Sequence, residues 1–146
     1  MANPPSPIKI KKGQVEYISR VDRTKYLLSE LTRAALKDVG KYVRNIMLTE
    51  ARKLPGHRRG KRALKAFQFW VRKQETDLIV GIKHNTWYGA QQELGSSNQP
   101  RRDILRNAVY KNIDEIRRIE GMYLSAIEDE NRALGLIDEE EGEGEE

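Results

Sequence analysis

This 146-residue chain has no cysteine and few aromatic residues, and its apolar runs are short. Without thiols it can form no disulfide framework, no cysteine-based metal site and no thiol nucleophile. Purely aliphatic runs, such as Leu78 to Val80, are far too short to span a bilayer. No basic and then apolar leader precedes the rest of the sequence, so we expect neither a secretory signal nor a membrane partner.

Acidic residues are sparse in most of the chain and crowded at its end. The chain has 27 Lys and Arg against 22 Asp and Glu, and seven of these acidic residues lie in 138–146. This Glu- and Gly-rich segment has nothing apolar to bury, and we expect it to be a disordered acidic tail. The basic remainder suggests contact with nucleic acid or with an acidic protein surface, although simple solubility explains such a charge equally well.

Residues 51–73 form the most basic stretch, with nine Lys and Arg and no Asp or Glu. Gly56 and Gly60 bracket part of it, which suggests a flexible loop after a helix. Contact with phosphate needs mobile cationic side chains without nearby carboxylates, and this loop supplies them. We therefore predict a surface facing DNA or a DNA channel, although a solvated loop is an equal alternative. Its residues are Arg58, Arg59, Lys61, Arg62 and Lys65.

Two long helical patterns flank a predicted hairpin. Apolar residues recur every three or four positions in 22–54 and again in 103–134, which predicts two amphipathic helices. Residues 65–82 alternate with period two around a polar turn at 74–77, which predicts two strands with one buried face. Trp70 falls on the other face, where it packs under a helix or fills a subunit contact, and we favour packing under a helix.

The order of these patterns predicts an α+β fold, with a small antiparallel sheet packed against two long amphipathic helices. We expect an N-terminal arm or edge strand over 1–21, a single α+β domain over 22–137 and the disordered tail over 138–146. A single copy cannot cover the apolar stripes of two such helices, which favours self-association.

The stretch 87–108 connects the predicted hairpin to the second helix. Gly95 and Asn98 tolerate positive φ, and Pro100 keeps the residue before it extended. An element therefore ends near Leu94, and another begins near Asp103.

The order of residues in this stretch resembles the tail-completion or neck proteins of lambda-like siphophages, the family named after gene product ten. Members carry a segment with Tyr, Ala, Glu and Gly and a later one with Pro, Arg, Leu, Arg and Ala. Here Tyr88, Ala90, Glu93 and Gly95 approximate the first segment, with Ala90 one place late. The second is matched by Pro100, Arg102, Leu105, Arg106 and Ala108. Ser96 and Ile104 stand for Thr and Phe, and Asp103 and Asn107 replace two prolines.

The resemblance implies a virion structural protein, made in the host cytoplasm, at the head–tail connection of a tailed bacteriophage or prophage. It implies a homo-oligomeric ring, sixfold or twelvefold, through which packaged DNA passes. The other partners would be a connector or stopper protein and a tail terminator or tail tube protein. We expect the subunit interface at Trp87, Tyr88, Glu93, Arg102 and Arg106. A basic nucleic-acid-binding protein that uses loop 51–73 is the alternative.

Few residues here suit catalysis. His57 and His84 are the only histidines, and neither has a carboxylate at metal-ligand spacing. A nuclease assembled from His57, His84, Arg58 and Glu93 is conceivable, but nothing in their spacing demands it. We therefore expect no enzyme, no cofactor and no metal.

Overall fold

The computed structural model describes residues 3–53, 65–84, 86–98 and 100–142. The fold class is α+β, as predicted. In chain order the elements are β1 (Ile8–Lys12), β2 (Val15–Ser19), α1 (Val21–Arg52), β3 (Phe67–Arg72), β4 (Asp77–Ile82), α3 (Trp87–Leu94), α4 (Ile104–Tyr110), α5 (Ile113–Ser125), the 3₁₀ helix η1 (Ala126–Glu128) and α6 (Glu130–Gly142).

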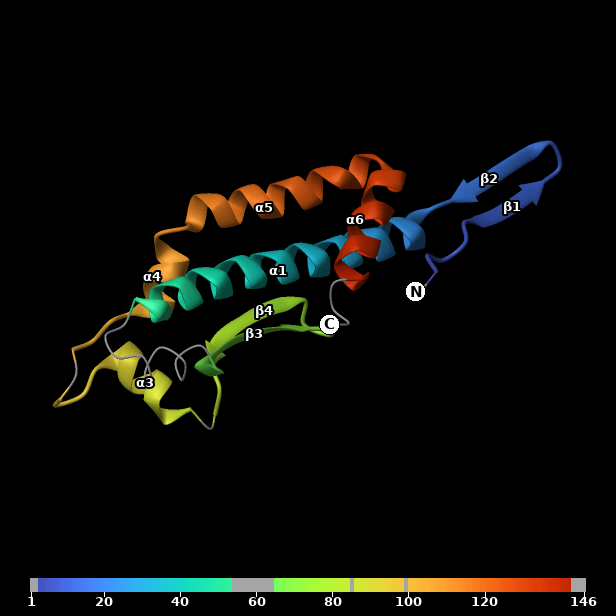
Figure 1. The fold of residues 1–146 in the computed structure, drawn as a ribbon. Coiled ribbons are helices and arrows are strands. Elements are labelled where there is room, and N and C mark those ends of the chain that lie inside the picture. The colour runs from blue at the N-terminus through green and yellow to red at the C-terminus, as the bar shows by residue number, and fades with distance from the viewer. Residues whose placement is uncertain (1–2, 54–64, 85, 99, 143–146) are drawn as a thin grey trace.

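Helix α1 lies at the centre of the molecule (Figure 1). It packs against α5 on one side and against β3 and β4 on the other, and it also contacts α4 and α6. The predicted apolar stripe is confirmed, since its members are buried: Leu27, Leu31, Ala35, Val39, Val43 and Met47. Because one helix supplies so much of the core, every neighbouring element is positioned by its contact with α1.

The predicted hairpin is also confirmed. Strands β3 and β4 are antiparallel, and Phe67 pairs with Ile82 and Phe69 with Val80. The inner face packs on α1, where Phe67 is fully buried. A Cβ atom on Gly40 of α1 would lie only 2.3 Å from the Phe69 ring. The close approach of hairpin and helix therefore requires glycine at position 40.

Trp70 does not pack under a helix, so the favoured prediction for this residue is wrong. Its side chain is 42% exposed and lies on the outer face of the hairpin, where it pairs with Ile79. The tip of the indole approaches Gly81, 4.0 Å from the position of a Cβ there. Strand alternation points Trp70 away from α1 because Phe69 points toward it.

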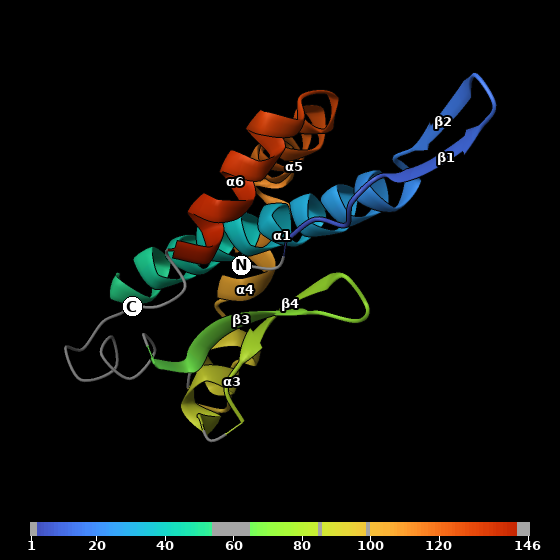
Figure 2. The same ribbon diagram turned by 90° about the vertical axis from the view of Figure 1, so that its right-hand side faces the viewer.

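The second predicted helix is broken into four pieces: α4, α5, η1 and α6. At the first break, Asn112 accepts a hydrogen bond from the Tyr42 hydroxyl and donates one to the Ala108 carbonyl. A side chain that bonds the preceding turn in this way competes with helix continuation. At the last break Asp129 is extended, and its carboxylate accepts the Asn131 N–H as a helix cap. The chain can therefore fold back, and α6 crosses α1 (Figure 2).

Helix α6 continues into the segment expected to be disordered. It ends at Gly142, and two of its residues, Ala133 and Ile137, belong to the core. The expectation of disorder from Asp138 is therefore wrong for residues 138–142, because the buried Ile137 anchors the helix just before them. Residues 143–146 lie outside the described residues.

The N-terminal segment forms a second hairpin rather than a single edge strand. Strands β1 and β2 pair over their whole length, and the hairpin (residues 8–19, here called the arm) projects beyond the N-terminal end of α1 (Figures 1 and 2). None of its residues belongs to the core. The two sheets are therefore separate, and only the one formed by β3 and β4 packs on α1.

Candidate assembly and nucleic-acid surfaces

The segment that carries the family resemblance forms a hydrogen-bonded clamp between α3 and α4. The Glu93 carboxylate accepts the N–H groups of Leu105 at 2.8 Å and Arg106 at 3.1 Å. These are donors of the first turn of α4, which lack partners inside their own helix. Glu93 therefore caps α4 from a different helix, a task that a residue at the helix start usually performs.

Backbone contacts reinforce the clamp. The Gln92 carbonyl accepts the Arg102 N–H at 3.0 Å, and the Glu93 carbonyl accepts the Asp103 N–H at 3.3 Å. Gly95 has a φ of +79°, and a Cβ there would lie 2.8 Å from the Arg101 nitrogen. The turn therefore closes only with glycine at this position. The predicted boundaries are confirmed, since α3 ends at Leu94 and Asp103 immediately precedes α4, although the element that ends at Leu94 is a helix.

Asp103 occupies the cap position of α4 without capping it. Its backbone is left-handed, with φ of 49°, and its carboxylate accepts a hydrogen bond from Arg101 at 2.6 Å instead. A non-glycine residue in this conformation is uncommon. Asp103 adopts this conformation within the clamp, where the Glu93 carboxylate accepts the N–H groups at the start of α4.

The five predicted interface residues do not form one exposed set. The Glu93 carboxylate accepts two hydrogen bonds within the chain, and its place in a subunit contact stays a prediction. Arg102 is half-buried, and its Nε makes no hydrogen bond within the described residues. Arg106 is exposed, with its guanidinium 5.8 Å from the Tyr110 ring centre. Trp87 and Tyr88 begin α3, and their side chains lie outside the described residues.

A groove of about 480 Å³ lies between α1 and α4, beside the clamp. Tyr42, Ile46 and Ala108 contribute to its lining, and Arg102 and Lys111 supply the cationic groups. A second concavity adjoins it and adds Lys53 and Arg101. Cationic side chains therefore gather around the C-terminal end of α1, on elements far apart in sequence.

Carboxylates neutralise only part of this cationic end. Lys53 pairs with Glu50 at 2.7 Å and Arg101 with Asp103 at 2.6 Å, both in exposed positions. Exposed pairs of this kind contribute little to stability. Arg102 and Lys111 form no ion pair within the described ranges, so a net positive surface remains, suited to phosphate or carboxylate.

The residues predicted to face DNA lie mostly outside the described residues. This applies to Arg58, Arg59, Lys61 and Arg62; only Lys65 is described, and it is exposed just before β3. The sequence prediction missed the contribution of Arg101 and Lys111, which come from the clamp and the end of α4. Their linear spacing gives no signal, since only folding brings Arg101 beside Lys53 and Lys111 near the C-terminal half of α1.

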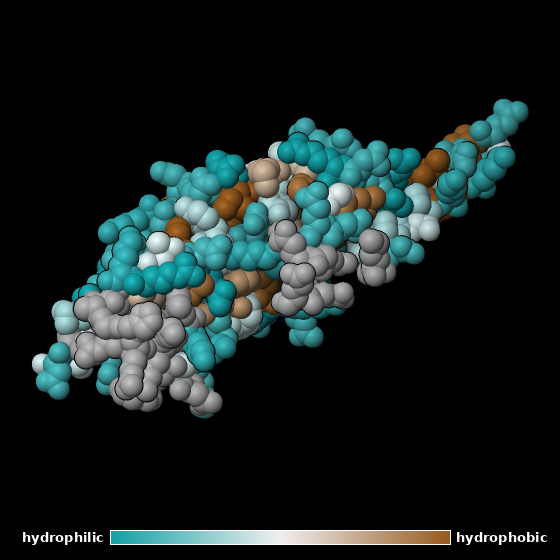
Figure 3. Space-filling view, in the orientation of Figure 1, coloured by the Kyte–Doolittle hydropathy of each residue, from teal (hydrophilic) through white to brown (hydrophobic). Residues whose placement is uncertain are grey.

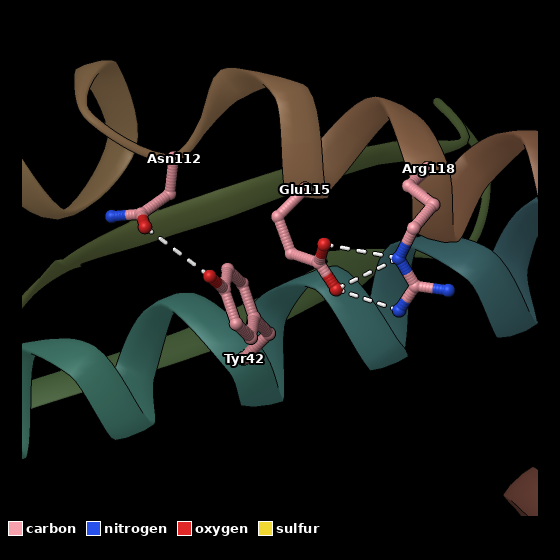
Figure 4. Close-up of polar contacts among 4 residues, drawn as sticks. All are labelled: Tyr42, Asn112, Glu115 and Arg118. Carbon is pink, nitrogen blue, oxygen red and sulfur yellow. Dashed lines mark hydrogen bonds and ion pairs between the residues drawn. The ribbon is translucent and has the colours of Figure 1, made fainter.

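Two carboxylates that do not line the groove have lowered pKa values. A hydrogen bond from Arg118 lowers the pKa of Glu115 below its ordinary value (Figure 4). Arg72 likewise lowers the pKa of Asp77 across the β3–β4 turn. Both are exposed ion pairs.

Among the described residues, no group of three or more His, Asp or Glu is arranged to hold a metal ion. His84 is exposed, and His57 lies outside this part of the chain. No helix in the described ranges is long and apolar enough to cross a membrane. No protein-family profile, curated protein or solved structure matches this chain.

Proposed function

We propose that this chain is a structural subunit of the head–tail connection of a tailed bacteriophage or prophage, where copies form a ring around a DNA channel. The observation that carries the proposal is the α3–α4 clamp. Glu93 and Gly95, two of the residues that carry the family resemblance, close it, and three others, Arg102, Leu105 and Arg106, supply backbone N–H groups to it. Matching residues that together close one local structure support the resemblance better than the same residues scattered over a surface would.

The charge distribution supports a channel. The clamp lies beside the cationic end of α1, with Arg101 and Lys111 at the two concavities. In a ring every copy would repeat this end, so a modest patch becomes a positive collar. Such a collar can hold a DNA end without reading its sequence, as passage of a genome requires.

Copy number and tail attachment test this proposal. In a phage that encodes the chain, particles should contain it as a ring of six or twelve copies at the neck, visible by electron microscopy. Arg106→Glu reverses an exposed charge beside the clamp and should leave heads and tails unjoined. Arg117→Glu, an exposed reversal on α5, is the matched control and should leave joining intact. A single copy per particle would end the ring proposal.

The second candidate is a nucleic-acid-binding protein that uses the same cationic end. It is favoured by Arg102 and Lys111, which form no ion pair with any other described residue. Binding to free duplex should then be strong at low salt and fall steeply as salt rises. Fluorescence anisotropy with a labelled duplex measures this. Weak binding to free DNA, together with rings in particles, would favour the structural role.

A further inference from the structure

The groove between α1 and α4 combines an apolar floor with cations. Tyr42, Ile46 and Ala108 contribute apolar surface to it, and its volume is about 480 Å³. Hydrophilic residues cover most of the body in the view of Figure 3, so a concavity with an apolar floor differs from the general surface. A volume of this size accommodates a small ligand or a few side chains rather than a double helix.

Arg102 lines this groove with its hydrogen bonding incomplete. Its Nε is buried and has no hydrogen-bond acceptor among the described residues. Buried polar atoms without a partner are uncommon, so the guanidinium has a donor that this part of the chain leaves unused. Once the side chain turns toward the groove, Nε and the neighbouring Nη suit the two oxygens of a carboxylate.

The groove is also short of negative charge. Glu50 is the one acidic residue among its described lining residues, and Lys53 already pairs with it at 2.7 Å. Arg102 and Lys111 form no ion pair with any described residue. The groove therefore complements an acidic partner that can also contact an apolar floor.

The last residues of the sequence, 138–146 (here called the acidic end), have this chemistry. They comprise seven Asp and Glu and two glycines, with no Lys or Arg. Asp138 and Glu139 are exposed and form no ion pair within the described ranges. The methylene groups of glutamate can lie on an apolar floor while the carboxylates reach the cations, and glycine allows the backbone to approach closely.

The acidic end falls short of the groove in its own chain. Helix α6 starts at the N-terminal end of α1, where Glu130 pairs with Arg23, and it crosses α1 rather than following it (Figures 1 and 2). Glu50, which lies beside Arg102, is roughly 40 Å further along α1 than Arg23, at a rise of about 1.5 Å per residue. A fully extended chain as long as residues 143–146 spans only about 14 Å. The acidic end that reaches the groove is therefore that of another copy.

We propose that the acidic end of one copy docks in the α1–α4 groove of a second copy. Its carboxylates bind Arg102 and Lys111, and its methylene groups lie on Ile46 and Ala108. The contact joins two different surfaces, so it can repeat from copy to copy around a closed assembly. The inference names a contact between copies in the proposed ring, and for that setting it rests on the proposed function.

The absence of cysteine allows a direct test, because any introduced thiol is the only one in its chain. Glu145→Cys and Asn107→Cys, the second in the groove, are made in separate full-length chains, mixed and treated with oxidised glutathione. We expect a disulfide-linked species of twice the chain mass. Tyr110→Cys, on α4 but outside the groove lining, is the matched control. It is more exposed than Asn107 but should link about tenfold more slowly, because docking concentrates the thiol only at the groove.

The linking rates distinguish the possible occupants. Equal rates for Asn107→Cys and Tyr110→Cys would overturn the proposal. A chain carrying both Glu145→Cys and Asn107→Cys that links within itself at high dilution would also overturn it, since the acidic end would then fold back on its own groove.

A charge substitution in the groove gives a second measurement. In the Asn107→Cys chain, Arg102→Gln should slow the link, whereas Arg117→Gln, at an exposed position on α5, should not. Equal effects of the two substitutions would contradict the contact.

Alkylation of Asn107→Cys tests DNA as the occupant. Changing the seven acidic residues of the acidic end to Asn or Gln should expose this thiol and speed its alkylation. Added duplex that protects the thiol equally well in the full-length and neutralised chains would make the groove a DNA site and overturn the proposal.

Particles separate this inference from the proposed function. Linking in solution without rings in particles would end the proposed function and leave the contact standing. Rings that form normally from the neutralised chain would end the contact and leave the proposed function standing.

Discussion

Glu93 lies on α3 but satisfies backbone donors of α4, so a substitution there acts on two helices. Asp103, which occupies the usual capping position, is held in a left-handed conformation and bonded to Arg101. Single side chains therefore hold the segment between the hairpin and α4 in one defined conformation.

We expect Glu93→Ala to lower the free energy of unfolding by roughly 1–2 kcal/mol, the usual cost of losing a helix cap. Glu93→Gln should cost less, because the amide oxygen still accepts one N–H. Urea denaturation followed by circular dichroism measures both. Glu139→Ala, an exposed carboxylate on α6, is the control and should be neutral. Equal losses for Glu93→Ala and Glu139→Ala would contradict the clamp.

Two glycines of the helices should respond in opposite directions to alanine. Gly121 faces open space, so Gly121→Ala should stabilise by about 0.5–1 kcal/mol through helix propensity. Gly40→Ala gains the same propensity but forces the Phe69 ring to move, and overpacking of this kind costs about 1–3 kcal/mol. Thermal unfolding should show a higher Tm for the first variant and a lower Tm for the second. A higher Tm for both would mean that Phe69 moves freely.

At the scale of elements, α6 behaves as part of the core rather than as a tail. Ala133 and Ile137 are buried against the rest of the molecule, and Arg23 of α1 pairs with Glu130 at the start of α6. The arm is the opposite case, since its strands pair with one another and add nothing to the core. The elements near the two ends of the described chain therefore differ, because α6 contributes to the core and the arm does not.

A truncation and a core substitution should show which part of the C-terminal segment contributes to stability. A chain ending at Gly142 should unfold like the full chain. Ile137→Ala removes most of a buried side chain and should cost roughly 2–4 kcal/mol. Guanidinium denaturation measures the difference. Equal stability of Ile137→Ala and the full chain would mean that α6 is not docked in solution.

At the scale of the whole molecule, a positively charged end lies on an elongated body organised by α1. This surface is modest alone, but a heterologous assembly would repeat it in every copy. Exposed ion pairs on this body, such as that of Glu115 with Arg118, contribute little to the stability of the fold.

These pairs predict the pH dependence of stability. The pKa values of Glu115 and Asp77 are lowered in the folded state. Their contribution to the free energy of unfolding is therefore present above the pKa of the unfolded state and is lost as the pH falls through the pKa of the folded state. The free energy of unfolding from these groups should be flat between pH 7 and about 5 and fall below about pH 4. Arg118→Met should make the acid loss shallower, whereas Arg117→Met should not. Identical acid profiles for the two variants would remove the pair's role.

The sequence alone determined the elements whose signals are local. The stripe of α1 repeats every three or four residues, and β3 and β4 alternate around a polar turn, so periodicity fixed both their type and their buried face. Gly95 and Pro100 likewise marked the end of one element near Leu94 and the start of the next near Asp103, because a turn of that kind needs particular backbone angles. The resemblance carried by residues 88–108 also needed only the order of the letters.

Tertiary structure alone decided what depends on partners far along the chain. The second helix breaks at Asn112 because Tyr42, seventy residues away, holds its side chain. Glu93 acts within the fold because α4 turns its free N–H groups toward it. Ile137 carries α6 past the start of the acidic run because α1 buries it, and the arm is left exposed because no core surface is turned toward it. Periodicity reports which face of an element is apolar, but only the packing of all elements decides whether that face is covered.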